Sequence, residues 1–204
     1  MPEPVVPSLR DLLNLEIPLE VVVSPGGGRA AIRVRRAHWN ENCYTNLCYV
    51  YEQGRKHTLA LTRSGDVEQM EWVGEDRLAL LKSPEGGGDF PAGKPQIWLY
   101  ENLVGEGWQI TEAKTGVDAF EPFAGGFLYL VLDPERDENK ARQDKFGTLI
   151  HFEQEDSASA LYYTSLEEVR RYQARLRASS EQEAKALTAP VIELSKLFEQ
   201  PLHI

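Results

Sequence analysis

The sequence has few of the residues that build a disulfide framework or a metal centre. It contains two cysteines, Cys43 and Cys48, and four histidines among 204 residues. The cysteines lie five residues apart in a segment with strand character, so their side chains are expected on opposite faces of a sheet and cannot pair. They also lack the paired spacing of zinc ligands. We therefore expect two free, mostly buried thiols and neither a resident metal nor a cofactor.

Long apolar runs and an excess of basic residues are also missing. No stretch of about 18 apolar residues occurs, which argues against a transmembrane helix. The first residues have neither the basic nor the apolar region of a secretory signal. Acidic residues outnumber basic ones by 32 to 22, and the formal net charge is −10. Because such a surface repels phosphate groups, we expect a protein that binds neither nucleic acid nor membranes. Without a membrane span or a secretory signal, the expected location is the cytoplasm.

The chain is instead rich in short apolar runs separated by turn residues. It has sixteen glycines and twelve prolines. Runs of three to six residues, bounded by Gly, Pro, Asn and Asp, are typical of strands joined by tight turns. These runs are residues 21–23, 30–34, 46–51, 57–61, 77–81, 96–100, 127–131 and 161–163. The pattern predicts an all-β fold.

These runs recur with a period of 48 to 50 residues. Residues 29–32 recur at 77–80 and again at 127–130, residues 47–50 recur at 97–100, and the pair 61–62 recurs at 110–111. A glycine-bearing turn stands just before the first strand of each copy, at 24–28, 73–76 and 124–126. A fixed period of this length, carried by three independent landmarks, predicts four-stranded blades repeated around an axis, which is a β-propeller.

The length of the chain sets the number of blades. At roughly 50 residues per blade it holds about three, whereas closed propellers use about four to eight. We therefore expect a partial β-propeller of WD40-like, four-stranded blades that exposes an uncovered blade face and an unpaired edge. The expected organisation is an N-terminal extension at 1–18, blades at 19–164, and a helical excursion or the start of further propeller at 165–204, in an incomplete chain.

Three segments depart from the strand pattern. Residues 133–145 include nine charged residues of both signs, which favours a solvated insertion, with a partner-docking segment as the alternative. Ser8 is expected to cap a short helical turn. From Ser165 the spacing becomes helical, with a capping box at 165–168 and, after Pro190, a second apolar run. The apolar face of this helix is expected to carry Leu166, Val169, Tyr172 and Leu176.

Several landmarks resemble the blade motifs of the prolyl oligopeptidase clan of serine peptidases. Residues 24–31 resemble the clan's Ser-Pro-Asp-Gly blade motif, and 36–44 are similar to a segment of its acylaminoacyl-peptidase-like members. Residues 96–99 and 107–111 are similar to the clan's blade strand and to its leucine–threonine blade end. The order of the later segments is also that of the clan: the charged run at 133–145, then Phe146-Gly147-Thr148, then residues 161–163. The resemblance covers roughly residues 8–164.

The resemblance implies the non-catalytic, amino-terminal propeller part of a peptidase of family S9. In that family the propeller gates the access of peptides to an α/β-hydrolase domain, by excluding large substrates and water. That domain is absent from this sequence, which has no Gly-x-Ser-x-Gly elbow. Ser64 is the nearest lookalike and is expected to be a turn serine. We therefore expect no catalytic, cofactor-binding or metal-binding residue here, and no peptidase activity from this chain alone.

Two other functions stay open. A stand-alone protein-binding module would close its ring by homo-oligomerisation, and a non-catalytic relative would dock a partner through residues 133–145. The remaining polar and aromatic features are expected to be structural. They are the carboxylates at 66–76, the glycines at 86–88, which lack the Lys-Ser/Thr of a phosphate loop, and Trp39, Trp72, Trp98 and Trp108, which are expected to pack in or between blades.

Overall fold

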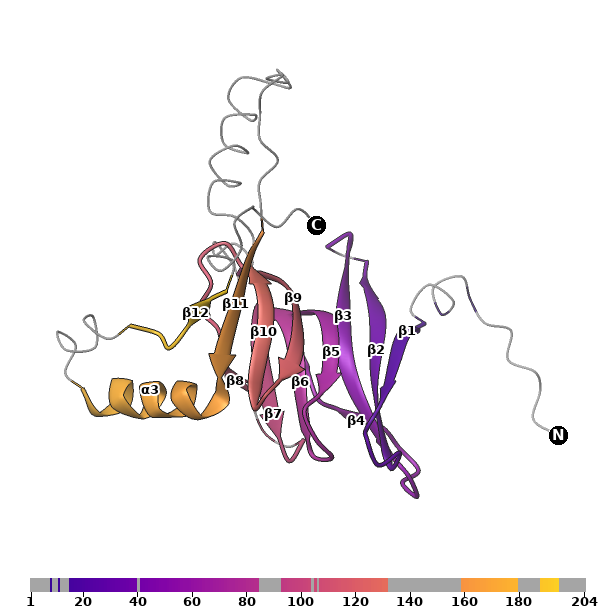
Figure 1. The fold of residues 1–204 in the computed structure, drawn as a ribbon. Helices are drawn as coiled ribbons and strands as arrows, with labels where there is room; N and C mark the ends of the chain where they lie inside the picture. Colours follow the sequence, from indigo (N-terminus) through magenta and orange to yellow (C-terminus); the bar gives the residue numbers. More distant parts are fainter. Residues whose placement is uncertain are drawn as a thin grey trace, which may run out of the picture. The chain divides into compact units, whose positions relative to one another are not determined.

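A computed structural model of the chain describes residues 8, 11, 15–39, 41–84, 93–103, 105, 107–131, 159–179 and 188–194. The strands form three four-stranded sheets (Figure 1). The first contains β1 (Ile17–Val23), β2 (Arg29–His38), β3 (Cys43–Glu52) and β4 (Leu59–Ala60). The second contains β5 (Asp66–Trp72), β6 (Arg77–Ser83), β7 (Gln96–Glu101) and β8 (Trp108–Gln109). The third contains β9 (Val117–Phe123), β10 (Gly126–Val131), β11 (Ala160–Ser165) and β12 (Ile192–Glu193), with helix α3 (Leu166–Ala178) between the last two.

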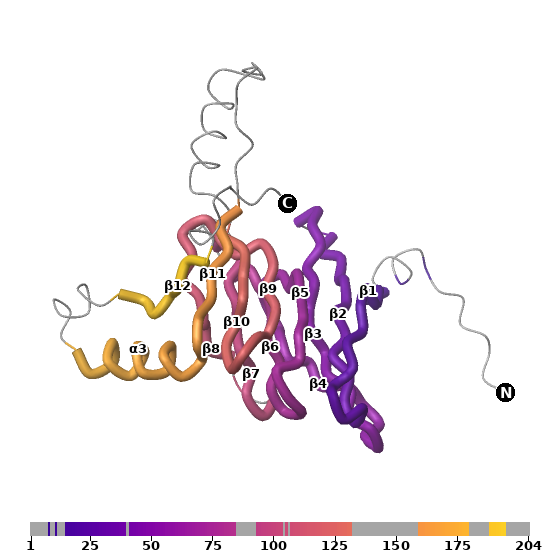
Figure 2. Tube along the Cα trace, viewed as in Figure 1, coloured from indigo at the N-terminus to yellow at the C-terminus, as the bar shows by residue number. Residues whose placement is uncertain are grey.

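Each sheet takes its four strands in chain order, which is the topology of a propeller blade. The colours of Figure 2 follow this order from β1 across the first sheet. The strands after the glycine-bearing turns, β2, β6 and β10, occupy the same position in their three sheets. The prediction of an all-β, partial β-propeller with about three four-stranded blades and a short helical segment is confirmed.

The glycine-bearing turns do not precede the first strand of each sheet, as the sequence had suggested, but the second. A further strand comes before each turn, namely β1, β5 and β9. The turns themselves form as expected, since the Ser24 amide donates to the Arg29 carbonyl at 2.8 Å and the Val73 amide to the Arg77 carbonyl at 2.9 Å. Strands β5 and β9 were missed because polar residues interrupt their apolar positions.

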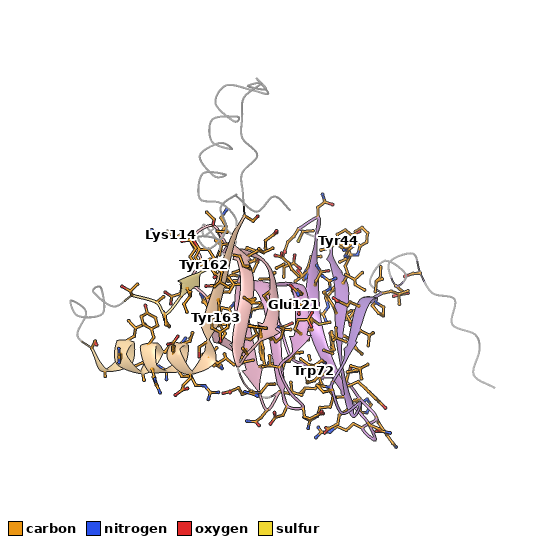
Figure 3. The ribbon with its side chains drawn as sticks, viewed as in Figure 1. Tyr44, Trp72, Lys114, Glu121, Tyr162 and Tyr163 are labelled. Atoms are coloured by element: carbon orange, nitrogen blue, oxygen red, sulfur yellow. The ribbon has the colours of Figure 1, made fainter. Side chains whose placement is uncertain are left out.

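The chain divides into two compact units, one formed by residues 1–93 and 99–108 and the other by 94–98 and 109–204. In the first unit, β5 lies against β1, β2 and β3. Hydrogen bonds join the two sheets there. The indole of Trp72, which is labelled in Figure 3, donates to the Val22 carbonyl at 2.9 Å, and the Asn46 amide donates to an Asp66 carboxylate oxygen at 2.8 Å. One face of the first sheet is therefore packed blade on blade.

In the second unit, helix α3 begins where β11 ends. Of the predicted apolar face, Leu166 and Val169 are buried, whereas Tyr172 and Leu176 are half-buried. Ser165 is the N-cap residue, but its side chain makes no capping hydrogen bond, so the predicted capping box is wrong. Within the apolar run after Pro190, Ile192 and Glu193 form β12, where Ile192 pairs with Tyr163 of β11. The segment after the helix thus supplies the fourth strand of the third sheet.

The third sheet is held together by aromatic contacts. Tyr129 and Tyr162 stack with ring centroids 5.7 Å apart, and Phe120 meets Phe127 edge to face at 5.6 Å. Such pairs contribute about 0.5–1.5 kcal/mol each beyond the area they bury. Gly126 is required at the start of β10, because a β-carbon there would lie 2.0 Å from the Thr164 carbonyl oxygen of β11.

Ser8 is the N-cap expected at the start of the chain. The Asp11 amide donates to the Ser8 hydroxyl oxygen at 3.2 Å, and the Asp11 carboxylate accepts from the Ser8 amide at 2.8 Å. These hydrogen bonds lower the pKa of the Asp11 carboxyl. The predictions for residues 86–89, 133–148, 180–187 and 195–204 lie outside the described residues. In the described part of the chain, no helix is long and apolar enough to cross a bilayer.

Candidate functional site

A pocket of 440 Å³ opens beside the β3–β4 turn in the first unit. Its lining combines charged and apolar side chains from β2, β3, β4, the β3–β4 turn and the segment after β7. We refer to it as the basic pocket. The residues used below are the ionisable Arg29, Glu52, Arg55, Lys56 and His57 and the apolar Val50, Leu59 and Leu103.

Strand register and a tight turn bring these residues together. Arg29 of β2 lies directly opposite Glu52 of β3. Gly54 has a φ of +84°, and the Arg55 amide donates to the Glu52 carbonyl at 3.0 Å. Together these two features reverse the chain in a tight turn directly after Glu52. Glycine tolerates this backbone conformation, whereas other residues are strained in it. The turn therefore folds Arg55 back onto the carboxylate that already faces Arg29.

One carboxylate serves two guanidinium groups in the basic pocket. Arg29 Nη2 lies 3.2 Å from Glu52 Oε1, and Arg55 Nε is paired with Glu52 Oε2. Among the described residues, Lys56 and His57 have no hydrogen-bond or ion-pair partner. The pocket therefore has a surplus of positive charge in a chain whose formal net charge is −10.

The basic pocket has no clear signature in the amino-acid sequence. Residues 53–58 have the composition of an ordinary solvated turn, and Arg29 belongs to a blade landmark. The local signal in the sequence is the run Arg55-Lys56-His57, but residues 33–38 hold three arginines and a histidine and are no less basic. Its partner Glu52 and the apolar wall at Leu103 are placed by the fold, so the run alone does not define a pocket.

A second polar cluster joins Glu16 to β2 and β3. Arg36 Nε donates to Glu16 Oε1 at 2.9 Å, Arg36 Nη2 donates to the Tyr49 hydroxyl oxygen at 2.8 Å, and that hydroxyl donates to Glu16 Oε1 at 3.1 Å. The hydrogen bond to Glu16 raises the pKa of Arg36, and burial raises the pKa of Tyr49. All three groups satisfy one another, so the cluster ties the start of the first sheet to its neighbouring strands.

The candidates weighed from the sequence lie in a turn or in contacts between strands. Ser64 is exposed in the turn between β4 and β5, as expected of a turn serine. Asp66 joins two sheets, and Glu68 Oε1 accepts from the Ser83 hydroxyl at 3.1 Å. Within the ranges given above, no three His, Cys, Asp or Glu side chains come close enough to hold a metal ion.

Both cysteines are free thiols, as predicted, but only one is buried. Burial raises the pKa of the Cys48 thiol to about 12, so it is inert at neutral pH. Cys43 is exposed, contrary to the expectation, because it lies at the end of the β2–β3 hairpin. The tryptophans differ in the same way: Trp72 joins two sheets, whereas Trp39, in the turn of that hairpin, is 48% exposed.

The face of the first sheet opposite to β5 carries exposed apolar side chains. Register places Val21, Ile32 and Tyr49 in one cross-strand row, and Val23, Ala30 and Tyr51 in the next. Val21 is 58%, Val23 57% and Tyr51 41% exposed, so side chains of these two rows are accessible, whereas Val34 and Leu47 of the adjoining row on the same face are buried. We call these two rows the open blade face. It agrees with the uncovered blade face expected of a partial propeller.

The chain was compared with known proteins. No model of a known protein family matches it, and no curated protein does so either. Solved structures do match. The apo form of the isopeptidase AtxE2 aligns with 84% of this chain and 33% of its own, at a TM-score of 0.54 and 14% identity. A variant of AtxE2 with bound Astexin3-dC4 aligns with 77% of this chain and 30% of its own, at a TM-score of 0.56 and 13% identity.

The acylaminoacyl peptidase of Pyrococcus horikoshii is a more distant match, with a TM-score of 0.48 and 10% identity over 74% of this chain and 23% of its own. At these identities the likeness to AtxE2 shows a shared fold. The chain spans about a third of the length of the isopeptidase it matches.

Proposed function

We propose that this chain is the propeller part of a cytoplasmic, oligopeptidase-like serine hydrolase, in which it gates the access of peptides to an α/β-hydrolase domain outside this sequence. The observation that carries the proposal is the set of three four-stranded blades, which aligns with part of the isopeptidase AtxE2. The resemblance of residues 24–31 and 107–111 to clan motifs supports the same assignment.

Gating of this kind needs shape and rigidity rather than reactive groups. A propeller surrounds a central channel whose width is set by its blades, so it admits short, extended peptides and excludes folded chains. It also keeps bulk water away from the reaction that follows. The described residues suit this role, because the strands of the blades have buried apolar cores. Ser64, the serine nearest in sequence to a nucleophile motif, is an exposed turn residue.

A serine-reactive probe tests the assignment. The native protein is immunopurified from its source with an antibody against this chain and treated with a fluorophosphonate, which modifies the nucleophilic serine of active serine hydrolases. We expect a labelled polypeptide that contains this chain or co-purifies with it in fixed ratio, and no labelling after heat denaturation. Pure native protein that carries the chain and no fluorophosphonate label would overturn the proposal.

The open blade face favours a second candidate, a binding module whose ring is closed by a second copy of this chain. The opposite face of the same sheet is hydrogen-bonded to β5, so the sheet is built to lie between two blades. Burial of Val21 and Val23 by a blade of the second copy would stabilise the pair by roughly 1.5–3 kcal/mol per side chain.

Sedimentation of the purified chain separates this candidate from the first. A homo-oligomeric module is expected to form a discrete dimer that Val21→Lys weakens at least tenfold, because a charge is then buried at the contact. Val191→Lys serves as the control, since Val191 is an exposed apolar residue that belongs to the other compact unit. A chain that stays monomeric at micromolar concentrations would exclude closure by self-association.

A further inference from the structure

The basic pocket contrasts in charge with the rest of the chain. Arg29, Arg55 and Lys56 carry three positive charges and Glu52 one negative charge, so the local net charge is +2 with His57 neutral. Over the whole chain acidic residues exceed basic ones, 32 to 22. A concave site of one sign focuses the field and concentrates ligands of the opposite sign. The site therefore favours an anion.

Arg55 is oriented to receive such an anion. Its Nε is held by Glu52, and its side chain is 68% exposed. Its two terminal nitrogens make no hydrogen bond with any described residue. A guanidinium group fixed at one edge presents its remaining N–H donors in a planar fork that matches the two oxygens of a carboxylate. Lys56, the next residue, adds a compact charge without a described partner.

Arg29 is a fixed part of the site rather than a free donor. Its Nη2 is paired with Glu52, and its Nη1 donates to the Glu75 carbonyl at 3.0 Å. It therefore holds Glu52 in place, and Glu52 in turn holds Arg55. Two buried apolar side chains, Val50 and Leu103, lie beside these polar groups. At 440 Å³ the pocket lies within the usual range for small ligands, about 300–1,000 Å³.

We propose that the basic pocket binds a short peptide segment through a carboxylate. The Arg55 fork takes the two carboxylate oxygens, Lys56 neutralises the charge, and the wall formed by Val50, Leu59 and Leu103 receives the neighbouring apolar side chain. This goes beyond gating, which excludes by size and needs no binding group. It is independent of the proposed function, because the 204-residue chain alone carries every residue of the pocket.

Titration of the ¹⁵N-labelled chain with capped peptides tests the proposal. The probes are acetyl-Gly-Leu-Leu with a free carboxyl end, the same peptide as its amide, and acetyl-Gly-Leu-Glu amide. At least one of the carboxylate peptides is expected to shift the amide signals of residues 52–59 and 102–103, with at least tenfold higher affinity than the neutral amide. Equal binding of the neutral amide, or equal shifts with inorganic phosphate, would overturn the proposal.

Two substitutions locate the binding. Arg55→Gln and Lys56→Gln are each expected to weaken the carboxylate peptide at least fivefold. Arg63→Gln, an exposed cation outside the pocket, is expected to leave it unchanged. Because Arg55 and Lys56 are exposed, the folded spectra of the variants should match the parent, which separates lost binding from lost structure. Unchanged affinity in both pocket variants would also overturn the proposal. The fluorophosphonate result does not depend on this outcome.

Discussion

At the scale of single residues, Thr62 and Thr111 show what the sequence period preserves. The Cys48 amide donates to the Thr62 hydroxyl oxygen at 2.8 Å, and the Ile97 amide donates to that of Thr111 at 3.0 Å. Both threonines are buried after the short fourth strand of their sheets. The repeat of residues 61–62 at 110–111 therefore preserves a hydrogen bond. In each sheet the fourth strand is too short to reach this buried amide of the third strand, and the threonine hydroxyl accepts from it instead.

Replacing either threonine by valine tests this role. Thr62→Val keeps the shape but leaves the buried Cys48 amide without an acceptor, which we expect to cost about 1–3 kcal/mol. Thr111→Val is expected to cost at least as much, since the Thr111 hydroxyl also donates to Gln96 Oε1 at 2.8 Å. The measurement is urea unfolding, with the exposed Thr58→Val as a control expected within about 0.5 kcal/mol of the parent. Parent-like stability in both buried variants would disprove the role.

At the scale of elements, apolar content decided what was predictable. Strands β2, β3, β6, β7 and β10 contain the apolar runs that recur with the period of 48 to 50 residues. Strands β5 and β9 were not predicted, because they carry carboxylates between their buried positions. Strand β12 was not predicted either, because it is two residues long and is defined by its pairing with β11. The helix was predicted because its apolar spacing is local, whereas the strand after it depends on a partner distant in sequence.

The β9–β10 turn gives a prediction at this scale. Ala124 and Gly125 form a two-residue turn with φ values of +45° and +75°. Alanine is strained in this left-handed region, so Ala124→Gly is expected to stabilise the chain by about 0.5–1 kcal/mol. Ala119→Gly, in the middle of β9, is the matched control and is expected to destabilise by about 0.5–1 kcal/mol. Urea unfolding of the two variants checks the signs, and destabilisation by Ala124→Gly would contradict the turn assignment.

At the scale of the whole molecule, the repeat predicted the blades and the open blade face, but not the basic pocket. The face follows from arithmetic, because three blades are fewer than a closed ring requires. The pocket requires Arg29 of one strand, the turn at 53–58 and the segment at 102–103 to meet, and no sequence period encodes that meeting. Composition indicated an acidic surface and gave no sign of a local concentration of positive charge.

The measurement that tests the account most directly is the dependence of cleavage rate on peptide length in the immunopurified native protein. If the propeller gates a hydrolase site, chromogenic peptides of a few residues should be cleaved at least roughly tenfold faster than the same scissile sequence embedded in a folded domain or in a peptide of about fifty residues. A fluorophosphonate-inhibited sample gives the background rate. Equal rates for short and long substrates would contradict the gating role of this chain.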